Sequence, residues 1–101
     1  MNDDLRRLID LDRVIHEPAR LLITAVLHTV ESADFLYLLH ATELTKGNLS
    51  SHLMRLEKAN YVSIEKVFEG KIPRTVCHLT EAGREAFETY QAQMNAVIHP
   101  Q

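Results

Sequence analysis

Basic and amide side chains gather in one part of the chain, and they are of the kinds that contact nucleic acids. The stretch from Thr45 to His78 holds six basic residues and three acidic ones, although the whole chain of 101 residues has a formal net charge of −3. This stretch is therefore +3 and the rest of the chain is −6. A basic segment within an acidic chain is typical of a local surface that faces phosphate. Its basic residues are Lys46, Arg55, Lys58, Lys66, Lys71 and Arg74.

The first half of this stretch predicts an amphipathic helix of about 45–59 that could read DNA. Leu49, Leu53 and Leu56 recur at helical spacing, so they would face the core. On the opposite face, asparagine and arginine side chains can pair bidentately with adenine and guanine edges, and small serines allow close approach to bases or phosphates. The expected DNA contacts of this helix are Thr45, Lys46, Gly47, Asn48, Ser50, Ser51, Arg55 and Lys58.

After this helix the spacing of apolar residues changes from helical to alternating, which predicts a β-hairpin of about 61–79. Glu69-Gly70-Lys71 is a turn signal, and the second strand would run from about residue 74 to residue 79. The tip of the hairpin would expose Lys71 and Arg74. We expect both side chains to contact DNA along a phosphate strand or an adjacent minor groove.

Two further helices are needed to position the helix of residues 45–59. Apolar residues at helical spacing predict one helix from Pro18 to about Val30 and another of about 34–41, with Ser32 as the expected cap of the second. Residues 42–44 then form a tight connection. Two short helices joined by a tight turn are the helix-turn-helix arrangement, whose second helix can enter the major groove.

The final helix, about 80–98, continues its apolar stripe beyond what one small core requires. Together with a first helix near the start of the chain, it leaves apolar side chains without a partner. A twofold homodimer would bury them and would place two reading helices about one DNA turn (~34 Å) apart. The expected dimer contacts are Leu5, Leu8, Ile9, Tyr90, Met94, Val97 and Ile98.

A family resemblance rests on the run LTKGNLSSHLMRLEKANYVSIEKVFEGKIPRTVCHLTEAGREAF, residues 44–87. This run resembles the winged-helix transcriptional regulators related to the MarR and ArsR groups, and in particular a short branch of them without a ligand pocket. The resemblance begins near residues 16–20 and covers most of the chain. Its most specific parts are residues 44–50, 56–59 and 79–84.

The resemblance implies one α+β, mainly helical domain over residues 1–101. This domain would be a winged helix-turn-helix with a two-stranded β-hairpin wing and with N- and C-terminal dimerisation helices. It would bind double-stranded DNA sequence-specifically as a cytoplasmic homodimer on a near-palindromic operator, and we expect it to act as a repressor. Three positions depart from the family pattern: Glu43 and Asn60 stand where glycine is usual, and Ile72 occupies a wing position that is often basic.

The composition excludes several other classes of protein. No apolar run approaches the roughly 20 residues that span a bilayer, so no membrane partner is expected. The start, MNDDLRRLID, lacks the cationic and apolar regions of a signal peptide, and the single cysteine cannot form an internal disulfide. Both features favour a reducing cytoplasm. Because no phosphate loop and no catalytic set of side chains stands out, we expect neither a cofactor nor enzymatic activity.

Four alternatives remain open at this stage. A metal sensor would need three or four converging ligands, whereas the six histidines are spread singly along the chain. A redox switch would need an exposed Cys77, whereas the alternation places Cys77 with Leu79 on the buried face. The acidic remainder of the chain, with Glu43 and Ile72, leaves room for a protein-interaction module without DNA binding. A small-molecule sensor is not favoured, because so short a chain leaves little room for an enclosed pocket.

Overall fold

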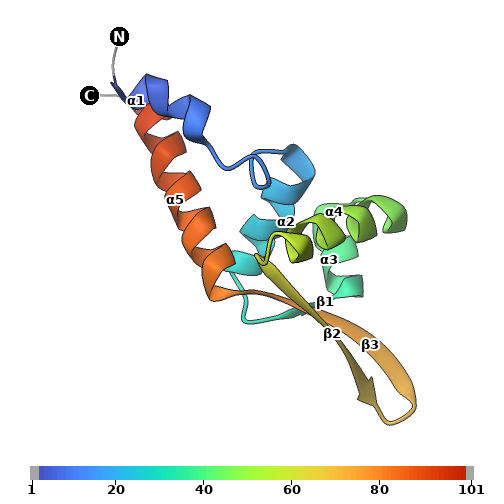
Figure 1. Cartoon of the computed structure of the whole chain (residues 1–101). Helices are drawn as coiled ribbons and strands as arrows, with labels where there is room; N and C mark the ends of the chain where they lie inside the picture. Colours follow the sequence, from blue (N-terminus) through green and yellow to red (C-terminus); the bar gives the residue numbers. More distant parts are fainter. Residues whose placement is uncertain (1–2, 100–101) are drawn as a thin grey trace.

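The computed structural model describes residues 3–99, which form an elongated molecule of 59 × 25 × 21 Å (Figure 1). We call α1 (Asp3–Arg6), the 3-10 helix η1 (Arg7–Asp10) and α5 (Glu81–Ile98) the arm. The head consists of α2 (Pro18–His28), β1 (Ala33–Asp34), α3 (Phe35–Thr42), α4 (Lys46–Lys58), β2 (Val62–Glu69) and β3 (Ile72–Leu79). The β2–β3 hairpin, which we call the wing, projects from the head on the side away from the far end of the arm (Figure 1).

The core of the head forms where α2, α3 and α4 pack on the inner half of the wing. The predicted inward face of α4 is confirmed, because Leu49, Leu53 and Leu56 are at most 2% exposed. They pack in one cluster with apolar residues of the other head elements, including Ile23, Leu27, Leu38, Val62, Cys77 and Leu79. The burial of Cys77 with Leu79 was also predicted and is likewise confirmed.

The helix ends follow side-chain capping, which fixes where each helix begins. The Thr45 hydroxyl accepts a hydrogen bond from the Asn48 backbone N–H at 3.2 Å, and Thr80 does the same for Gly83 at 3.0 Å. The prediction of Ser32 as the cap of α3 is wrong. Asp34 caps that helix by accepting from the Tyr37 N–H at 2.8 Å, because residues 33–34 are extended and pair with the sheet.

The sheet has three antiparallel strands in the order β1-β3-β2, rather than the two that the sequence predicts. The hairpin register runs from Val62 opposite Leu79 to Glu69 opposite Ile72. The additional strand is only two residues long and pairs Ala33 with Cys77. So short a strand has no alternating pattern from which it could be recognised. The α+β winged helix-turn-helix architecture is otherwise as predicted.

Two residues other than glycine adopt left-handed backbone conformations within residues 3–99, and both end helices. Asn60, with φ of 65°, closes α4: its N–H donates to the Glu57 carbonyl, and the Tyr61 N–H donates to the Leu56 carbonyl. This pattern is the Schellman motif, and asparagine tolerates the left-handed position as predicted. Glu43 has φ of 56° at the end of α3. Glycine adopts this conformation without strain, which explains why glycine is usual at the position that Glu43 occupies here.

The arm has its own small core, which joins it to the start of α2. Leu11, Ile15, Phe87 and Tyr90 are buried together, and the Tyr90 hydroxyl lies 2.8 Å from His16 Nδ1. Tyr90 is only 4% exposed. Its side chain therefore packs almost entirely against other residues of the same chain, whereas the sequence analysis expects it to contact a second copy.

Gly83 allows α5 to begin directly against the end of α4. A Cβ atom at this position would lie 2.0 Å from the Tyr61 carbonyl oxygen, which is backbone and cannot move aside as a flexible side chain could. The same oxygen accepts a hydrogen bond from the Thr80 N–H at 3.0 Å. The close approach therefore belongs to a junction that fixes the arm on the head.

We predict that Gly83→Ala destabilises the fold by about 1–3 kcal/mol or more, because the added methyl group overpacks this junction. In a domain of this size, that loss lowers the melting temperature by at least about 4 °C, which thermal unfolding would measure. The matched control is Gly47→Ala, since a Cβ there meets nothing within 4 Å. Equal melting temperatures for the two variants would contradict the assignment.

Candidate nucleic-acid interface

The outward face of α4 carries every residue that the sequence predicted for it. Because the three leucines hold the opposite face in the core, helical geometry turns these side chains to the surface. The N-terminal turn is also accessible from solvent: Thr45 caps the helix, and Gly47 has no side chain to cover the backbone. The exposed residues of this face are Thr45, Lys46, Gly47, Asn48, Ser50, Ser51, Arg55 and Lys58.

The N-terminal turn of α4 has an electrostatic character that favours an anion. Backbone N–H groups of the first turn lack carbonyl partners within the helix, and the helix dipole places partial positive charge there. There is no acidic residue in this turn, and Lys46 adds a full positive charge. The arrangement can bind a phosphate group near the helix start and present Asn48 to a base edge.

A shallow, open hollow of about 320 Å³ lies between α2 and the C-terminal half of α4. Arg55 and Lys58 line it, together with a methionine that the sequence analysis did not select. Met54 is 66% exposed and shares the helix face of Ser50 and Ser51. It was missed because methionine is usually a core residue, although its spacing of four and three residues from these serines places it on the same face. The residues lining the hollow are Arg20, Ser51, His52, Met54, Arg55 and Lys58.

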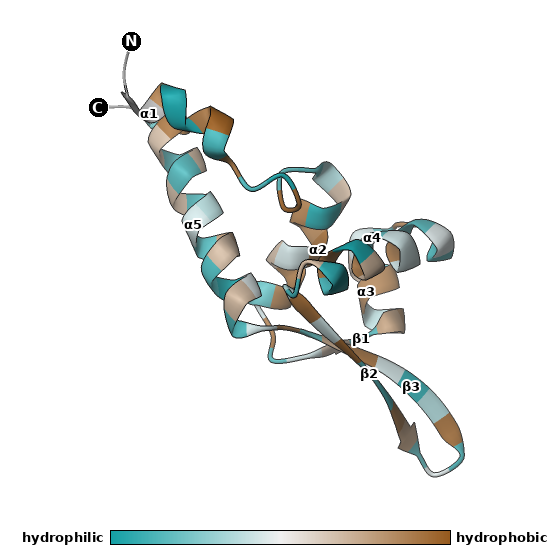
Figure 2. Ribbon diagram, in the orientation of Figure 1, coloured by the Kyte–Doolittle hydropathy of each residue, from teal (hydrophilic) through white to brown (hydrophobic). Residues whose placement is uncertain are grey.

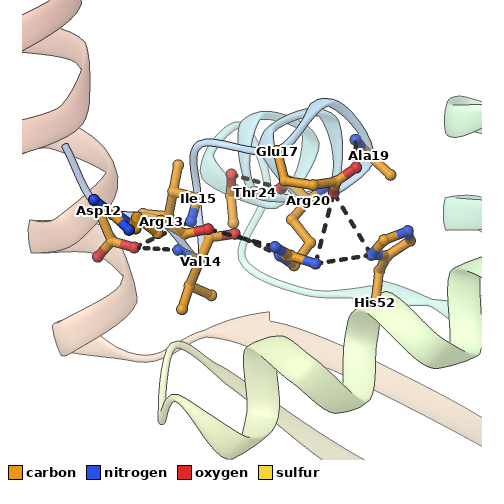
Figure 3. Close-up of polar contacts among 9 residues, drawn as sticks. All are labelled: Asp12, Arg13, Val14, Ile15, Glu17, Ala19, Arg20, Thr24 and His52. Atoms are coloured by element: carbon orange, nitrogen blue, oxygen red, sulfur yellow. Dashed lines mark hydrogen bonds and ion pairs between the residues drawn. The ribbon is translucent and has the colours of Figure 1, made fainter. Parts of the chain in front are cut away.

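At one side of this hollow, a cluster of polar and charged side chains joins α2 to α4 (Figure 3). The Arg20 Nη1 lies 3.2 Å from His52 Nδ1, and the Glu17 carboxylate lies 3.5 Å from the same His52 nitrogen. Burial acts to raise the pKa of Glu17, but hydrogen bonds from the Arg20 and Ala19 backbone N–H groups, with smaller effects from the neighbouring His52 and Arg20 side chains, lower it overall. The His52 side chain therefore joins α4 to α2, beside the exposed face of α4.

The wing presents less free positive charge than the sequence predicts. Lys71 is exposed in the turn beside Gly70, whose φ of 62° lets the chain reverse there. Arg74 instead lies on β3, with its guanidinium 3.5 Å from an Asp34 carboxylate oxygen and 3.4 Å from one of Glu69. These pairs offset part of its charge. The outer wing also carries apolar side chains among its charged ones, seen as brown segments between teal ones in Figure 2, because Phe68 and Ile72 are both about two-thirds exposed.

The histidine, cysteine and carboxylate side chains within residues 3–99 do not form a metal site. Within residues 3–99, no three or more His, Cys, Asp or Glu side chains converge as metal ligands would. Across the same residues, no helix is both long and apolar enough to cross a membrane. His28 pairs with Glu88 at 3.1 Å, and His16 contacts Tyr90. His28 thus contacts α5 from the end of α2, and His16 contacts it from the segment that precedes α2.

Comparison with known proteins agrees with this geometry. Residues 19–98 match the family model described as a winged helix DNA-binding domain. The chain belongs to this family. Both the family and the fold are those of DNA-binding regulators and not of enzymes, which confirms the resemblance to winged-helix regulators found in the sequence.

The similarity of this winged-helix protein to known proteins covers most of its length. It is 35% identical over 79 residues to an uncharacterized protein of Methanocaldococcus jannaschii, a match that covers 77% of this chain and 85% of the relative. A transcriptional regulator homologue from Pyrococcus horikoshii has a TM-score of 0.87 and 31% identity, covering 96% of this chain and 95% of that one. A MarR-family regulator from Enterococcus faecalis shares the fold, with a TM-score of 0.78, 19% identity, and coverage of 97% and 87%.

Cys77 is placed where it cannot respond readily to oxidants or alkylating agents. Its side chain is fully buried, and burial raises the pKa of the thiol to about 11, with smaller effects from Glu57 and Asp34. At pH 8 such a thiol is ionised in only about one molecule in a thousand, and the thiolate is the reactive form.

We therefore predict that Cys77 in the folded protein reacts with iodoacetamide at pH 8 far more slowly than in guanidinium chloride. Mass spectrometry over time would measure the modified fraction under both conditions. Comparable rates in the two conditions would show that the thiol is accessible and would reopen the redox-switch alternative.

Proposed function

We propose that this protein is a sequence-specific, double-stranded-DNA-binding transcriptional regulator that acts as a homodimer on a near-palindromic operator. The observation that carries the proposal is the division of α4 into a leucine face buried in the head and a polar, basic face exposed along its whole length. This is the arrangement required of a recognition helix in the major groove. A repressor is the expected form, since binding at an operator blocks other proteins from the same DNA. A cytoplasmic location is part of the proposal.

Different parts of the surface have different roles in this proposal. Asn48 and Arg55 read adenine and guanine edges, while Met54 offers an apolar contact to the methyl group of thymine. Lys46, Lys58 and the serines contact bases or phosphates along the groove. Lys71 anchors the wing on the DNA backbone, with less help from Arg74 because that side chain is paired with carboxylates. Most of the binding free energy then comes from α4.

Exposed apolar side chains on the arm support the homodimer. Leu5, Leu8, Ile9 and Ile98 are between 40% and 74% exposed, and Met94 and Val97 are half-buried. They lie on α1, η1 and the last turns of α5, which pack together at the end of the molecule remote from the wing (Figure 1). A second copy of the arm would cover them, and a twofold axis there would direct both recognition helices toward one face of the DNA.

A protein-interaction module remains the second candidate, and it has one specific observation in its favour. Leu36 and Tyr37 on α3 and Phe68 and Ile72 on the wing are all more than half exposed. Exposed apolar side chains of this size can mark a protein contact. Salt separates the two candidates, because binding to phosphates weakens steeply as salt is added, whereas an apolar contact responds little.

The proposed DNA binding is tested by selecting bound sequences from a random duplex library and then measuring variants on the selected site. We predict that Arg55→Ala and Asn48→Ala each cost about 1–3 kcal/mol of discrimination at one base position. Fluorescence anisotropy over a salt series would give the affinity and its salt dependence.

The matched control is Arg84→Ala, which removes an exposed arginine from α5 outside the proposed interface. Its affinity and specificity should equal those of the unmodified protein. Failure of the library to enrich any sequence at low salt would refute sequence-specific binding and favour the interaction module.

The proposed dimer is tested by placing a charge on the arm. We predict that Ile9→Glu, at a side chain that is 74% exposed, converts the dimer to a monomer because it buries a carboxylate in the apolar contact. Sedimentation equilibrium would measure the mass. Ile72→Glu is the matched control, since this wing residue is 67% exposed and should leave the mass unchanged. A monomeric unmodified protein, or an Ile9→Glu dimer of undiminished stability, would exclude the arm as the contact.

A further inference from the structure

Residues 11–17, which we call the connection, join the arm to the head, and Asp12 fixes the path of the chain at their start. One carboxylate oxygen of Asp12 accepts hydrogen bonds from the N–H groups of Val14 at 2.8 Å and Ile15 at 3.1 Å. The other accepts from the Tyr61 hydroxyl, at the end of α4. That hydrogen bond, followed by burial and the charge of Asp12, raises the pKa of Tyr61 to about 12, so the phenol stays protonated and continues to donate. The connection is thus tied to one end of the recognition helix.

A single guanidinium makes the second tie, to the middle of the same helix. Arg20 donates from Nε to the Val14 carbonyl at 2.5 Å and from Nη2 to the Arg13 carbonyl at 3.4 Å. Its Nη1 donates to His52 Nδ1 at 3.2 Å. Figure 3 shows Arg20 between the connection on one side and His52 on the other. The side chain is only 15% exposed, so most of this brace is shielded from solvent.

The chemistry of this brace requires an arginine. A guanidinium offers five N–H donors in a rigid plane, so one side chain can reach two carbonyls and an imidazole at once. A lysine ammonium is a single flexible donor centre and cannot span the three acceptors. Glu17 lies 3.8 Å from the same guanidinium and 3.5 Å from His52, which balances the charge of the group.

We propose that Arg20 is a positioning residue for DNA recognition, which sets the angle between the recognition helix and the arm and thereby the spacing of half-sites that the dimer accepts. This inference rests on the proposed function and on its dimer through the arm. The two recognition helices of such a dimer are related only through their arms. A small rotation of the head on the arm, in a molecule 59 Å long, moves each helix by a distance comparable to one base-pair step of about 3.4 Å.

The fold has enough other contacts to remain intact without the brace. The arm core of Leu11, Ile15, Phe87 and Tyr90 also joins arm and head, and Tyr61 still bonds to Asp12. Removal of the Arg20 contact should therefore loosen the angle without unfolding the protein. The expected consequence is a change in tolerance for half-site spacing, and not in the reading of a single half-site.

The test uses the full chain and the operator obtained by library selection, together with duplexes whose centre is one base pair longer or shorter and a duplex with a single half-site. The unmodified protein should prefer the selected spacing over either altered one by roughly fivefold or more. Arg20→Ala, Arg20→Lys and His52→Ala should bring that ratio close to one. Because Arg20 and His52 also line the hollow beside Arg55 and Lys58, the single half-site measures any direct effect on affinity, which cancels in the ratio.

His52→Asn is the matched control, because the amide oxygen of asparagine can accept the Arg20 hydrogen bond close to the position of Nδ1. It should retain the spacing preference, and a merely structural role of the histidine ring would not predict this rescue. Melting temperature and mass are measured for each variant. If Arg20→Ala does not fold, the contrast between His52→Ala and His52→Asn decides the question alone.

Two results would overturn the inference, and they have different meanings. If folded, dimeric Arg20→Ala and His52→Ala keep the spacing preference of the unmodified protein, Arg20 does not set the angle, while the proposed function stands. If the unmodified protein enriches no sequence, the proposed function fails and the positioning role fails with it.

Discussion

The burial of three leucines on one face of α4 is the constraint on which the rest of the structure depends. Once Leu49, Leu53 and Leu56 are inside the head, the helix cannot rotate without exposing them, and each such side chain contributes about 1.5–3 kcal/mol when buried. The polar face of the helix is therefore fixed to the outside by apolar packing and not by its own contacts. Polar residues on that face are free to be chosen for recognition because they do not hold the fold together.

The junction at the end of α4 extends this constraint to the arm. The Schellman turn at Asn60 directs the chain into β2, and the Asn60 and Tyr61 carbonyls both accept hydrogen bonds from Thr80 at the start of α5. Gly83 allows α5 to approach the Tyr61 backbone there, and the Tyr61 hydroxyl reaches across to Asp12 in the connection. The helix α4, the wing and the arm therefore meet at one small region of backbone.

Features governed by local periodicity could be read from the sequence, and features governed by tertiary pairing could not. The leucine spacing predicts α4 and its exposed face, and the change to alternation predicts the wing with Cys77 inside. In contrast, β1 exists only because Ala33 and Asp34 meet β3, and this pairing moves the cap of α3 from Ser32 to Asp34. The pairing of Arg74 with Asp34 likewise joins residues that are 40 positions apart in the chain.

The candidate site shows the same division. Its exposed polar residues were predictable because helical spacing places them opposite the leucines. Met54 was missed because its type indicates a core residue. The contacts that Arg20 makes with Val14 and His52 could not be predicted, because the partners come from three separate segments. Tyr90 was expected on the surface because its spacing continues the apolar stripe, but the fold of the connection brings His16 and Leu11 over it.

The order of the strands also bears on how copies of this protein can associate. With β3 in the centre, β2 has one edge without a strand partner within the described residues, and exposed edges invite pairing with other chains. On β2 this edge carries Glu65, Lys66 and Glu69, all exposed, and the outer part of β3 carries Pro73, which has no N–H to donate. Such edges resist extension of the sheet from one molecule to the next. These features disfavour aggregation through the wing, even though the apolar side chains of Phe68 and Ile72 are exposed near its tip.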